Sequence, residues 1–418
     1  MTNERGTTVS IRIDFSPVSA CHLELGPIRP PSEGQDRSLL IRVNRNCPWN
    51  RCLFCNTYKG KRFEYRSLGE VKGDIDVARA IAGGLERASR SLGYGGAITD
   101  EVIGAVIRGM PEVYGQEAAD RETLILRYQS LSIVGNWLNS GARTVFLQDA
   151  NAIIMRQREL VEVIKHLKSA FPTIERVTSY ARSRTVNHHS MDDMRELGTA
   201  GLSRLHIGME SGCDEVLAFM DKGVTGDQHI DAGKKVTAAG ISLSEYYMPG
   251  LGGREWSVKH ALDSARVLSE IDGDFIRLRS LIVRGGSDLY GRMVGGEFGA
   301  LSEDEMVAEI ELFVENLNCH SYLASDQMSN LLWEVEGQLP QDKDRVLSII
   351  RSYRSMPPIE RMSFRLKRRA QSFVAVHGGF PPELARIVEE AKEAIVAEAP
   401  DAEAKTNRAI AGLKQQFV

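Results

Sequence analysis

The chain lacks any apolar run long enough to cross a bilayer, and its first twenty residues lack the apolar stretch of a signal peptide. Charge of neither sign dominates, because 52 basic residues stand against 56 acidic ones for a net charge of −4. Composition therefore gives no general attraction for nucleic acid or membrane surfaces. Six cysteines in 418 residues are too few for a disulfide framework. We expect a cytoplasmic protein with reduced thiols.

The chain has enough length and apolar content to fold as a large globular protein. It has 418 residues, of which 42% are hydrophobic, and this length is typical of two or three domains. We predict an N-terminal extension at 1–37 with a short strand from Val9 to Phe15, a core at 38–300, and a mainly helical region at 301–418.

Apolar strand-like runs alternate with helical stretches through the predicted core. Expected helices lie at 159–170, 191–197, 227–239 and 257–271. Expected strands lie at 39–43, 144–147, 176–180, 204–208, 242–247 and 275–279. Alternation of this kind indicates parallel pairing through right-handed crossovers. The fold class predicted is α/β, a partial (β/α)6 TIM-type barrel.

The first crossover is abnormally long. Residues 56–143 stand where one loop and one helix would suffice. Apolar residues step by three and four from Val71 to Leu92, and a second helical stretch runs from about Arg121 to Leu138. We expect a helical insertion packed on the barrel.

The region after residue 300 shows helices and no convincing strand pair. Ser302 is a typical cap for a helix reaching Leu317, and further helices are expected at 342–355 and 381–397.

Three cysteines fall within nine residues, directly after the first expected strand. They are Cys47, Cys52 and Cys55, and no fourth cysteine is near them in the sequence. Structural zinc sites and ordinary four-iron electron carriers normally take four protein ligands. Three ligands on a cubane cluster leave one iron open to a small molecule. The trio therefore favours an enzyme site over a structural metal, with zinc or chance clustering as the alternatives.

Distinctive residues follow each of the other expected strands. Barrel enzymes carry their chemistry at these carboxyl ends. The segments are Gln148–Asn151, Ala181–Arg184, Gly208–Gly212, Met248–Gly253 and Arg279–Ser280.

These motifs together resemble the radical S-adenosylmethionine superfamily. The likeness covers about residues 38–290 and is closest to elongator-type acetyltransferases, methylthiotransferases and oxygen-independent coproporphyrinogen dehydrogenases. Its most specific parts are the cysteine run and the segment Gly-Met-Glu-Ser-Gly-Cys-Asp-Glu-Val-Leu at 208–217, followed by Met-Asp-Lys-Gly.

The resemblance implies two cofactors, a [4Fe-4S] cluster and S-adenosylmethionine. Cys47, Cys52 and Cys55 would ligate the cluster, and Phe54 matches the apolar position near the adenine. It further implies reductive cleavage to a 5′-deoxyadenosyl radical, a small-molecule substrate that the sequence does not identify, and an external electron donor of the flavodoxin or ferredoxin type.

Two departures from the family pattern affect the expected contacts. Four residues, not three, separate Cys47 from Cys52, and the Gly-Gly-Glu expected after the second strand is absent. Gln148 or Asp149 would then accept a hydrogen bond from the ammonium group of the methionine part. Asp149 could instead cap the next helix.

The other expected cofactor contacts come from later strand ends. Glu210 could instead favour a helix N-terminus, and Arg279 could instead form a buried ion pair. The residues and their expected partners are Glu210 and Ser211 for the ribose or amino-acid part, Arg182 or Ser183 for the carboxylate, Gly250 for the adenine face, and Arg279.

Two other functions remain open from the sequence. An electron-transfer or regulatory protein would need a fourth ligand, for which Cys21, His22 and Cys319 are available. A radical enzyme that modifies tRNA would bind RNA through the basic run from Arg361 to Arg369, which is otherwise an amphipathic surface helix. A small-molecule substrate is favoured by analogy alone.

Overall fold

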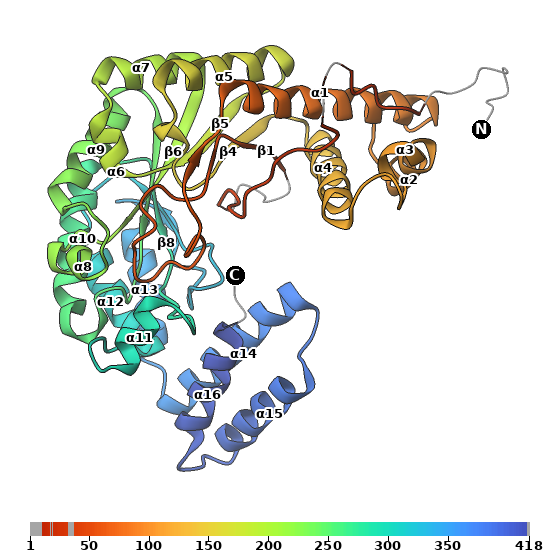
Figure 1. Cartoon of the computed structure of the whole chain (residues 1–418). Helices are drawn as coiled ribbons and strands as arrows, with labels where there is room; N and C mark the ends of the chain where they lie inside the picture. The colour runs from red at the N-terminus through yellow and green to blue at the C-terminus, as the bar shows by residue number, and fades with distance from the viewer. Residues whose placement is uncertain (1–10, 17, 19, 32–36, 416–418) are drawn as a thin grey trace. The chain divides into compact units, whose positions relative to one another are not determined.

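The computed structural model describes residues 11–16, 18, 20–31 and 37–415 (Figure 1). These residues contain sixteen α-helices, and eight strands form one sheet in the order β1-β4-β5-β6-β7-β8-β9-β10. The sheet does not close into a barrel. Contacts divide the chain into two compact units, one of Met1–Trp49, Gly60–His206 and Ala238–Ser242, the other of Asn50–Lys59, Ile207–Thr237 and Leu243–Val418.

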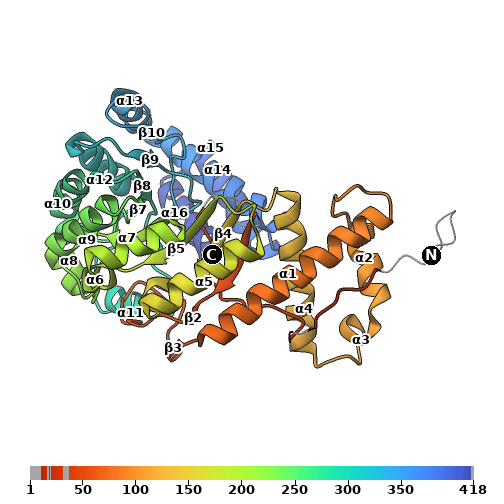
Figure 2. The same cartoon turned by 90° about the horizontal axis from the view of Figure 1, so that it is seen from above.

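The first unit holds the early strands and the helical insertion (Figure 2). Its strands are β1 (Ser38–Arg42), β2 (Asn44–Arg45), β3 (Glu64–Tyr65), β4 (Thr144–Gln148), β5 (Arg176–Ala181) and the start of β6 (Leu202–Glu210). Its helices are α1 (Leu68–Ser91), α2 (Asp100–Gly109), α3 (Pro111–Tyr114), α4 (Arg121–Asn139), the short 3-10 turn Ala152–Ile154, α5 (Gln157–Ala170), α6 (Ser183–His188) and α7 (Met191–Ala200). β1 pairs in parallel with β4, and β4 with β5.

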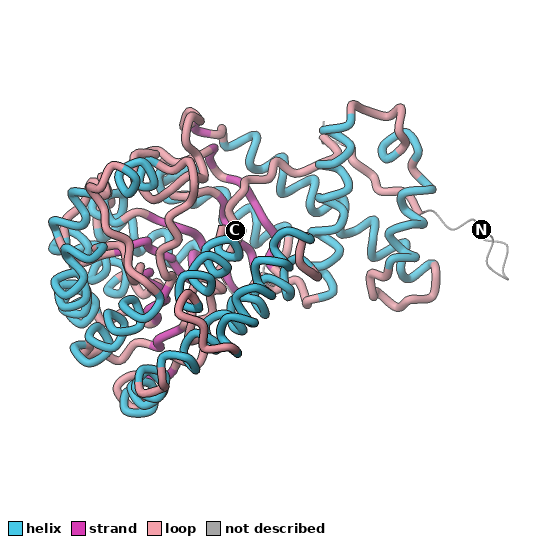
Figure 3. The backbone as a smooth tube through the Cα atoms, turned by 90° about the horizontal axis from the view of Figure 1, so that it is seen from below, coloured by secondary structure: helices cyan, strands magenta, loops and turns pink. Residues whose placement is uncertain are grey.

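The second unit continues the alternation of strands and helices, which can be followed in Figure 3. Its strands are the end of β6, most of β7 (Ser242–Tyr247), β8 (Phe275–Leu278), β9 (Tyr322–Ala324) and β10 (Gly337–Gln338). Its helices are α8 (Asp214–Phe219), α9 (Gly226–Ala238), α10 (Gly253–Ile271), α11 (Asp288–Val294), α12 (Glu303–Asn316), α13 (Lys343–Arg354), α14 (Pro358–His377), α15 (Pro382–Val396) and α16 (Ala402–Lys414). β7 pairs in parallel with β8, and β8 with β9.

The six predicted strands and the helical insertion are confirmed. All six strands form near their expected bounds, because each apolar run is buried between helices. Within the insertion, α1 packs on α5 and α4 contacts β1. The insertion also contains α2 and α3, which lie between α1 and α4 and which the prediction missed.

Two predictions about the ends of the chain need correction. The absence of strands after residue 300 is wrong, because β9 extends the sheet beside β8 and β10 pairs antiparallel with β9. These strands have three and two residues, too few to show a period in the sequence. Of the expected strand at Val9–Phe15, the first two residues lie outside the described part, and 11–15 form no strand. Ile13 packs instead against Gly84 of α1.

Three helices close the second unit around their own apolar core. α14, α15 and α16 lie side by side (Figure 1) and bury Leu366, Phe373 and Leu413, among others. α14 is amphipathic as expected, but its buried face also carries Arg365 and Arg369. No helix in the described ranges is long and apolar enough to span a membrane.

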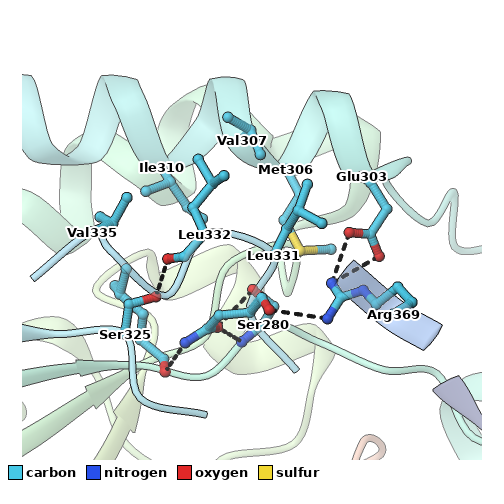
Figure 4. Close-up of a pocket in the computed structure, with 12 residues that line it drawn as sticks. Ser280, Glu303, Met306, Val307, Ile310, Ser325, Leu331, Leu332, Val335 and Arg369 are labelled. Atoms are coloured by element: carbon cyan, nitrogen blue, oxygen red, sulfur yellow. Dashed lines mark hydrogen bonds and ion pairs between the residues drawn. The ribbon is translucent and has the colours of Figure 1, made fainter. Parts of the chain in front are cut away.

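A buried charge cluster ties these helices to α12. Arg369 Nη2 lies 3.0 and 2.7 Å from the two carboxylate oxygens of Glu303 (Figure 4), and Lys414 Nζ lies 2.9 Å from Oε1. The cluster borders a narrow cavity under α12 lined mainly by apolar side chains. Burial opposes ionisation of Glu303, but the charges of Arg369 and Lys414 outweigh it and bring the Glu303 pKa to about 2.

Substituting Glu303 should therefore destabilise the protein in a pH-dependent way. Because the folded pKa lies below the ordinary 4.5, the stability that ionised Glu303 contributes is present above about pH 4.5 and is lost as the pH falls toward about 2. We expect Glu303→Gln to lower the free energy of unfolding by about 3 kcal/mol at pH 7.

Urea unfolding of wild type and variant at pH 7 and pH 3 measures this difference. Glu393→Gln on the exposed side of α15 is the matched control and should change stability little. If Glu303→Gln lowers the free energy of unfolding by the same amount at both pH values, the lowered pKa of Glu303 would be contradicted.

Candidate functional site

The loop that carries the three cysteines is bracketed by a small hairpin. β2 pairs antiparallel with β3, with Asn44 opposite Tyr65, so residues on either side of the loop are held together. Asn46 and Asn50 adopt left-handed backbone conformations with φ of 69° and 50°, which asparagine tolerates better than most residues. The backbone of the cysteine loop thus has a defined turn conformation.

A buried carboxylate fixes the start of this loop. Asp149 is fully buried at the end of β4 and accepts a hydrogen bond from Arg42 Nε at 2.8 Å. Its Oδ2 also accepts the backbone N–H of Asn46 at 3.2 Å, one residue before Cys47. Asp149 was predicted to contact the cofactor, and its place beside Cys47 gives it a direct structural role at the loop.

Gln148 is buried beside Asp149 and holds the N-terminal segment. Its side-chain amide accepts from the Gly26 N–H at 3.0 Å and donates to the Gly26 carbonyl at 3.1 Å and to that of Ile28. Gly26 lies so close to Asp149 that an added Cβ would stand 2.6 Å from its Oδ1. The segment before β1 therefore packs directly against the residues that shape the loop.

Glu24 connects the same segment to the arginines around the loop. Its carboxylate accepts from Arg45 Nε at 2.7 Å and from Arg42 Nη1 at 3.1 Å. Burial raises the Glu24 pKa, but the bond from Arg45 and the charges of Arg66, Arg45 and Arg42 bring it below its ordinary value. Glu24 is therefore the second carboxylate, after Asp149, that binds Arg42.

The residues after β5 reach the loop through Trp49. The guanidinium carbons of Arg182 and Arg184 lie 4.9 and 5.7 Å from the Trp49 ring centroid, within cation–π range. The Arg182 N–H is fixed by the buried Asn151 side chain at 3.2 Å, and Ser183 is buried at the start of α6. Arg182 thus lies beside Trp49, two residues after Cys47, within the first unit.

In the second unit, Cys52 and Cys55 are joined by a tight turn. The Cys55 N–H donates to the Cys52 carbonyl at 3.3 Å, and the Leu53 N–H donates to the Met220 carbonyl at 3.1 Å. Phe54 packs against the apolar cluster formed around α8 and α11. Cys47, Cys52 and Cys55 are all half-buried, whereas Cys213 and Cys319 are buried. Half-exposed thiols suit ligands that an incoming cluster must reach.

Two acids and one lysine gather where β6 ends. Glu210 has a φ of 67°, a left-handed conformation that costs a non-glycine residue energy. Its Oε1 lies 3.4 Å from Lys222 Nζ, and Lys222 lies 5.7 Å from the Phe54 ring centroid. Glu245 of β7 is 1% exposed. Burial, and then the charge of Glu210, raises the Glu245 pKa well above its ordinary value.

This group contains unsatisfied polar atoms. In the described part of the chain, neither carboxyl oxygen of Glu245 has a hydrogen-bond partner, and Glu210 Oε2 also has none. Buried polar groups are normally paired, so such atoms point to a missing ligand. Lys222 and Glu245 were not among the predicted site residues. Lys222 lies in the Met-Asp-Lys-Gly segment that carries part of the resemblance, whereas Glu245 lies inside the expected strand at 242–247 and had no such signal.

The remaining predicted residues are placed as follows. Ser211 is buried and its hydroxyl lies 2.8 Å from His260 Nδ1. Gly250 has a φ of 84° and donates its N–H to Glu309 Oε1 at 2.6 Å. Arg279 is exposed after β8, so the alternative that it forms a buried ion pair does not hold. Their contacts with a cofactor stay predictions.

One other group of possible metal ligands lies in the described ranges. The ligand atoms of Cys213, Glu215 and Asp263 lie within 4.8 Å of one another. Lys259 already pairs with the Glu215 carboxylate, and burial raises the Cys213 pKa to about 11. A thiol that resists ionisation beside a lysine is a poor cation ligand.

Comparisons with known proteins give low-identity relatives. No family model matches the sequence. The tRNA uridine(34) acetyltransferase of Methanocaldococcus jannaschii is 22% identical over 116 residues, 28% of this chain, and an uncharacterized protein of that organism is 25% identical over 114 residues, 27% of this chain. The chain spans 21% and 35% of the lengths of these relatives.

Solved structures show a similar distant likeness. The archaeal Elp3 of Methanocaldococcus infernus has 15% identity and a TM-score of 0.36 over 43% of this chain and 46% of its own. The radical SAM enzyme HemN of Escherichia coli has 13% identity and a TM-score of 0.35 over 41% and 40%. The cobalamin-dependent S-adenosylmethionine radical enzyme OxsB, with S-adenosylmethionine bound, has 12% identity and a TM-score of 0.39 over 91% and 59%.

HemN and OxsB are described as radical S-adenosylmethionine enzymes, the superfamily that the motifs of this chain resemble.

Gly26→Ala should disturb the cysteine loop from a distance in sequence. The added methyl group would meet Asp149, so the bonds from Asp149 to Arg42 and to the Asn46 N–H would shift. We expect the variant to bind less than half of the wild-type iron after anaerobic reconstitution, and iron analysis measures this.

Gly73→Ala is the matched control, because its added methyl group meets open space on α1. It should keep the wild-type iron content. Equal iron content in the two variants would show that Asp149 does not support the loop.

Proposed function

We propose that the chain is a radical S-adenosylmethionine enzyme with one [4Fe-4S] cluster held by Cys47, Cys52 and Cys55. The observation that carries the proposal is a trio of half-exposed cysteines in a loop of defined conformation, together with carboxyl oxygens of Glu210 and Glu245 that are buried and have no hydrogen-bond partner among the described residues. When bound and reduced, the cluster supplies the electron that cleaves S-adenosylmethionine to a 5′-deoxyadenosyl radical, which abstracts a substrate hydrogen.

The unsatisfied polar atoms of the second unit fit a zwitterionic, hydroxyl-bearing ligand. Lys222 can bind a carboxylate, and Glu210, whose Oε1 lies 3.4 Å from Lys222 Nζ, can accept from an ammonium or a hydroxyl. Burial and the charge of Glu210 raise the Glu245 pKa and so favour its neutral carboxyl, which can both donate to and accept from a ribose hydroxyl. S-adenosylmethionine carries each of these groups.

Apolar and cationic residues of the same unit complete the environment. Phe54 directly precedes Cys55 in the chain, its ring centroid lies 5.7 Å from Lys222 Nζ, and it offers a ring face on which an aromatic base can stack. The turn from Met248 to Gly253 needs glycine at Gly250, which has a φ of 84° and where an added Cβ would stand 2.9 Å from Met306 Cε. Arg284 lies within electrostatic range of Cys55 and of Arg279.

A small-molecule substrate fits the chain better than RNA bound at the basic run of α14. Arg365 pairs with Glu403, and Arg369 with Glu303, both from buried positions. Arg361 bonds to Asp304, and Arg368 to Glu334. Most of this basic run is therefore committed to the fold. A flavodoxin or ferredoxin would serve as the external electron donor.

The reaction class is tested by turnover after reconstitution. We expect wild type, loaded without air and reduced, to bind about four irons and to form 5′-deoxyadenosine and methionine, quantified by chromatography with mass detection. Cys52→Ala should form neither product. A protein that binds four irons yet leaves S-adenosylmethionine intact would contradict the reaction class.

The cofactor contacts are tested separately from the cluster. We expect Lys222→Ala and Glu245→Leu each to weaken S-adenosylmethionine binding by about tenfold, because the first removes a charge and the second removes the carboxyl group that would bond to the ligand. Equilibrium binding to the loaded protein measures this, with iron content unchanged.

Lys234→Ala on the exposed face of α9 is the matched control. It should bind the cofactor as wild type does. If Lys222→Ala binds as tightly as Lys234→Ala, the ligand carboxylate lies elsewhere.

A further inference from the structure

A buried histidine of α10 joins the ends of β6 and β7. The Met248 N–H, directly after β7, donates to the carbonyl of Glu210, the last residue of β6, at 3.0 Å. The hydroxyl of Ser211, the next residue, lies 2.8 Å from His260 Nδ1. His260 Nε2 lies 3.1 Å from the Met248 carbonyl. His260 therefore bonds to the first residue after each of the two strands.

The partners of His260 fix the positions of its protons. The Met248 carbonyl can only accept, so Nε2 carries a proton and donates it. In the neutral ring Nδ1 is then an acceptor, and the Ser211 hydroxyl donates to it. Burial lowers the His260 pKa and so favours the neutral ring, although the charge of Glu309 acts in the opposite direction. His260 thus donates to the end of one strand and accepts from the end of the other.

The Ser211 hydroxyl is committed to the protein. Its one proton goes to His260 Nδ1, and its oxygen accepts the Cys213 N–H at 3.0 Å. Ser211 is 0% exposed. A hydroxyl in this position holds the chain after β6 and has no proton left to donate to a ligand.

Glu309 of α12 holds the turn after β7. Its carboxylate is fully buried, and Oε1 accepts the Gly250 N–H at 2.6 Å and the Tyr247 hydroxyl at 3.2 Å. Oε2 accepts the Ser257 hydroxyl at 2.5 Å. The ring of Tyr247 in turn lies 4.9 Å from the ring of His260, measured between centroids. Side chains from α10 and α12 therefore fix the same turn.

We propose that His260 is a positioning residue that, together with Ser211, holds Glu210 in the left-handed conformation from which its carboxylate meets the cofactor. This inference rests on the proposed function, because it takes Glu210 as a cofactor contact. A glutamate at a φ of 67° keeps that conformation only while its surroundings hold it. The bond from Met248 and the Ser211–His260 bond hold its two sides. Ser211 accordingly acts through His260 and does not touch the cofactor.

A double-mutant cycle between Ser211 and His260 tests the inference. His260→Gln can keep a donor for the Met248 carbonyl but lacks the ring nitrogen that meets Ser211. We expect Ser211→Ala and His260→Gln each to weaken S-adenosylmethionine binding to the loaded protein by about threefold, the effect of one lost hydrogen bond. The double variant should bind as the single variants do. Equilibrium binding measures this, with iron content unchanged.

Direct contact of Ser211 with the cofactor would give a different result. Ser211→Ala would then weaken binding further in the His260→Gln background, and this additivity would overturn the inference. Wild-type affinity in both single variants would overturn it as well. Should His260→Gln fail to fold, wild-type affinity in Ser211→Ala alone would be sufficient to do so.

Hydrogen–deuterium exchange measures the positioning without the cofactor. We expect faster exchange in the segments 208–213 and 248–253 of both single variants. Tyr353→Phe is the matched control, because it removes a buried hydrogen bond to Asp304 elsewhere in the same unit. It should change neither the exchange of these segments nor the affinity. An equal loss of affinity in Tyr353→Phe would show a general loss of stability and overturn the positioning role.

The outcomes also separate this inference from the proposed function. A wild-type protein that cleaves S-adenosylmethionine while the cycle gives additive losses overturns only the positioning role. A loaded wild-type protein that binds no S-adenosylmethionine overturns the proposed function and this inference together.

Discussion

The Asp149 carboxylate is the interaction on which the start of the cysteine loop depends. It is fully buried and binds both Arg42 of β1 and the Asn46 N–H that precedes Cys47. A buried charge is costly unless it is paired, so Asp149 and Arg42 hold each other in place. Gln148 and Gly26 close the same site from the N-terminal segment. The position of Cys47 thus follows from contacts made far from it in the sequence.

In the second unit, by contrast, some buried polar groups lack partners within the described part of the chain. Glu210 adopts a costly backbone conformation, and Glu245 lies buried in a strand without a hydrogen-bond partner among the described residues. Both features cost stability in the free protein. A ligand that bonds to the unpaired oxygens of Glu245 and Glu210 would offset part of this cost, which is why the proposed function places the cofactor there. The strong ion pair between Glu303 and Arg369 lies in the same unit and offsets part of that cost.

How much of the fold and of the site could be predicted from the sequence depended on how many residues each sequence pattern spans. The six strands were predictable because each is an apolar run of four or more residues followed by a helix. β9 and β10 were not, since two or three residues carry no period and depend on pairing with β8. The cysteines stood out by their clustering together with their position directly after the first strand, and their role as cluster ligands stays a prediction. Glu245 was missed because a glutamate in a strand ordinarily marks an exposed position, and only the structure shows that this one is buried.

The central claim is that three cysteines hold a four-iron cluster with one iron open to S-adenosylmethionine. Electron paramagnetic resonance of the reduced protein, recorded with and without S-adenosylmethionine, tests it most directly. The account predicts a [4Fe-4S] signal whose g-values change when the cofactor is added, and that change should be lost in Cys47→Ala. A spectrum that is unaffected by the cofactor, or a protein that holds zinc in place of iron, would contradict it.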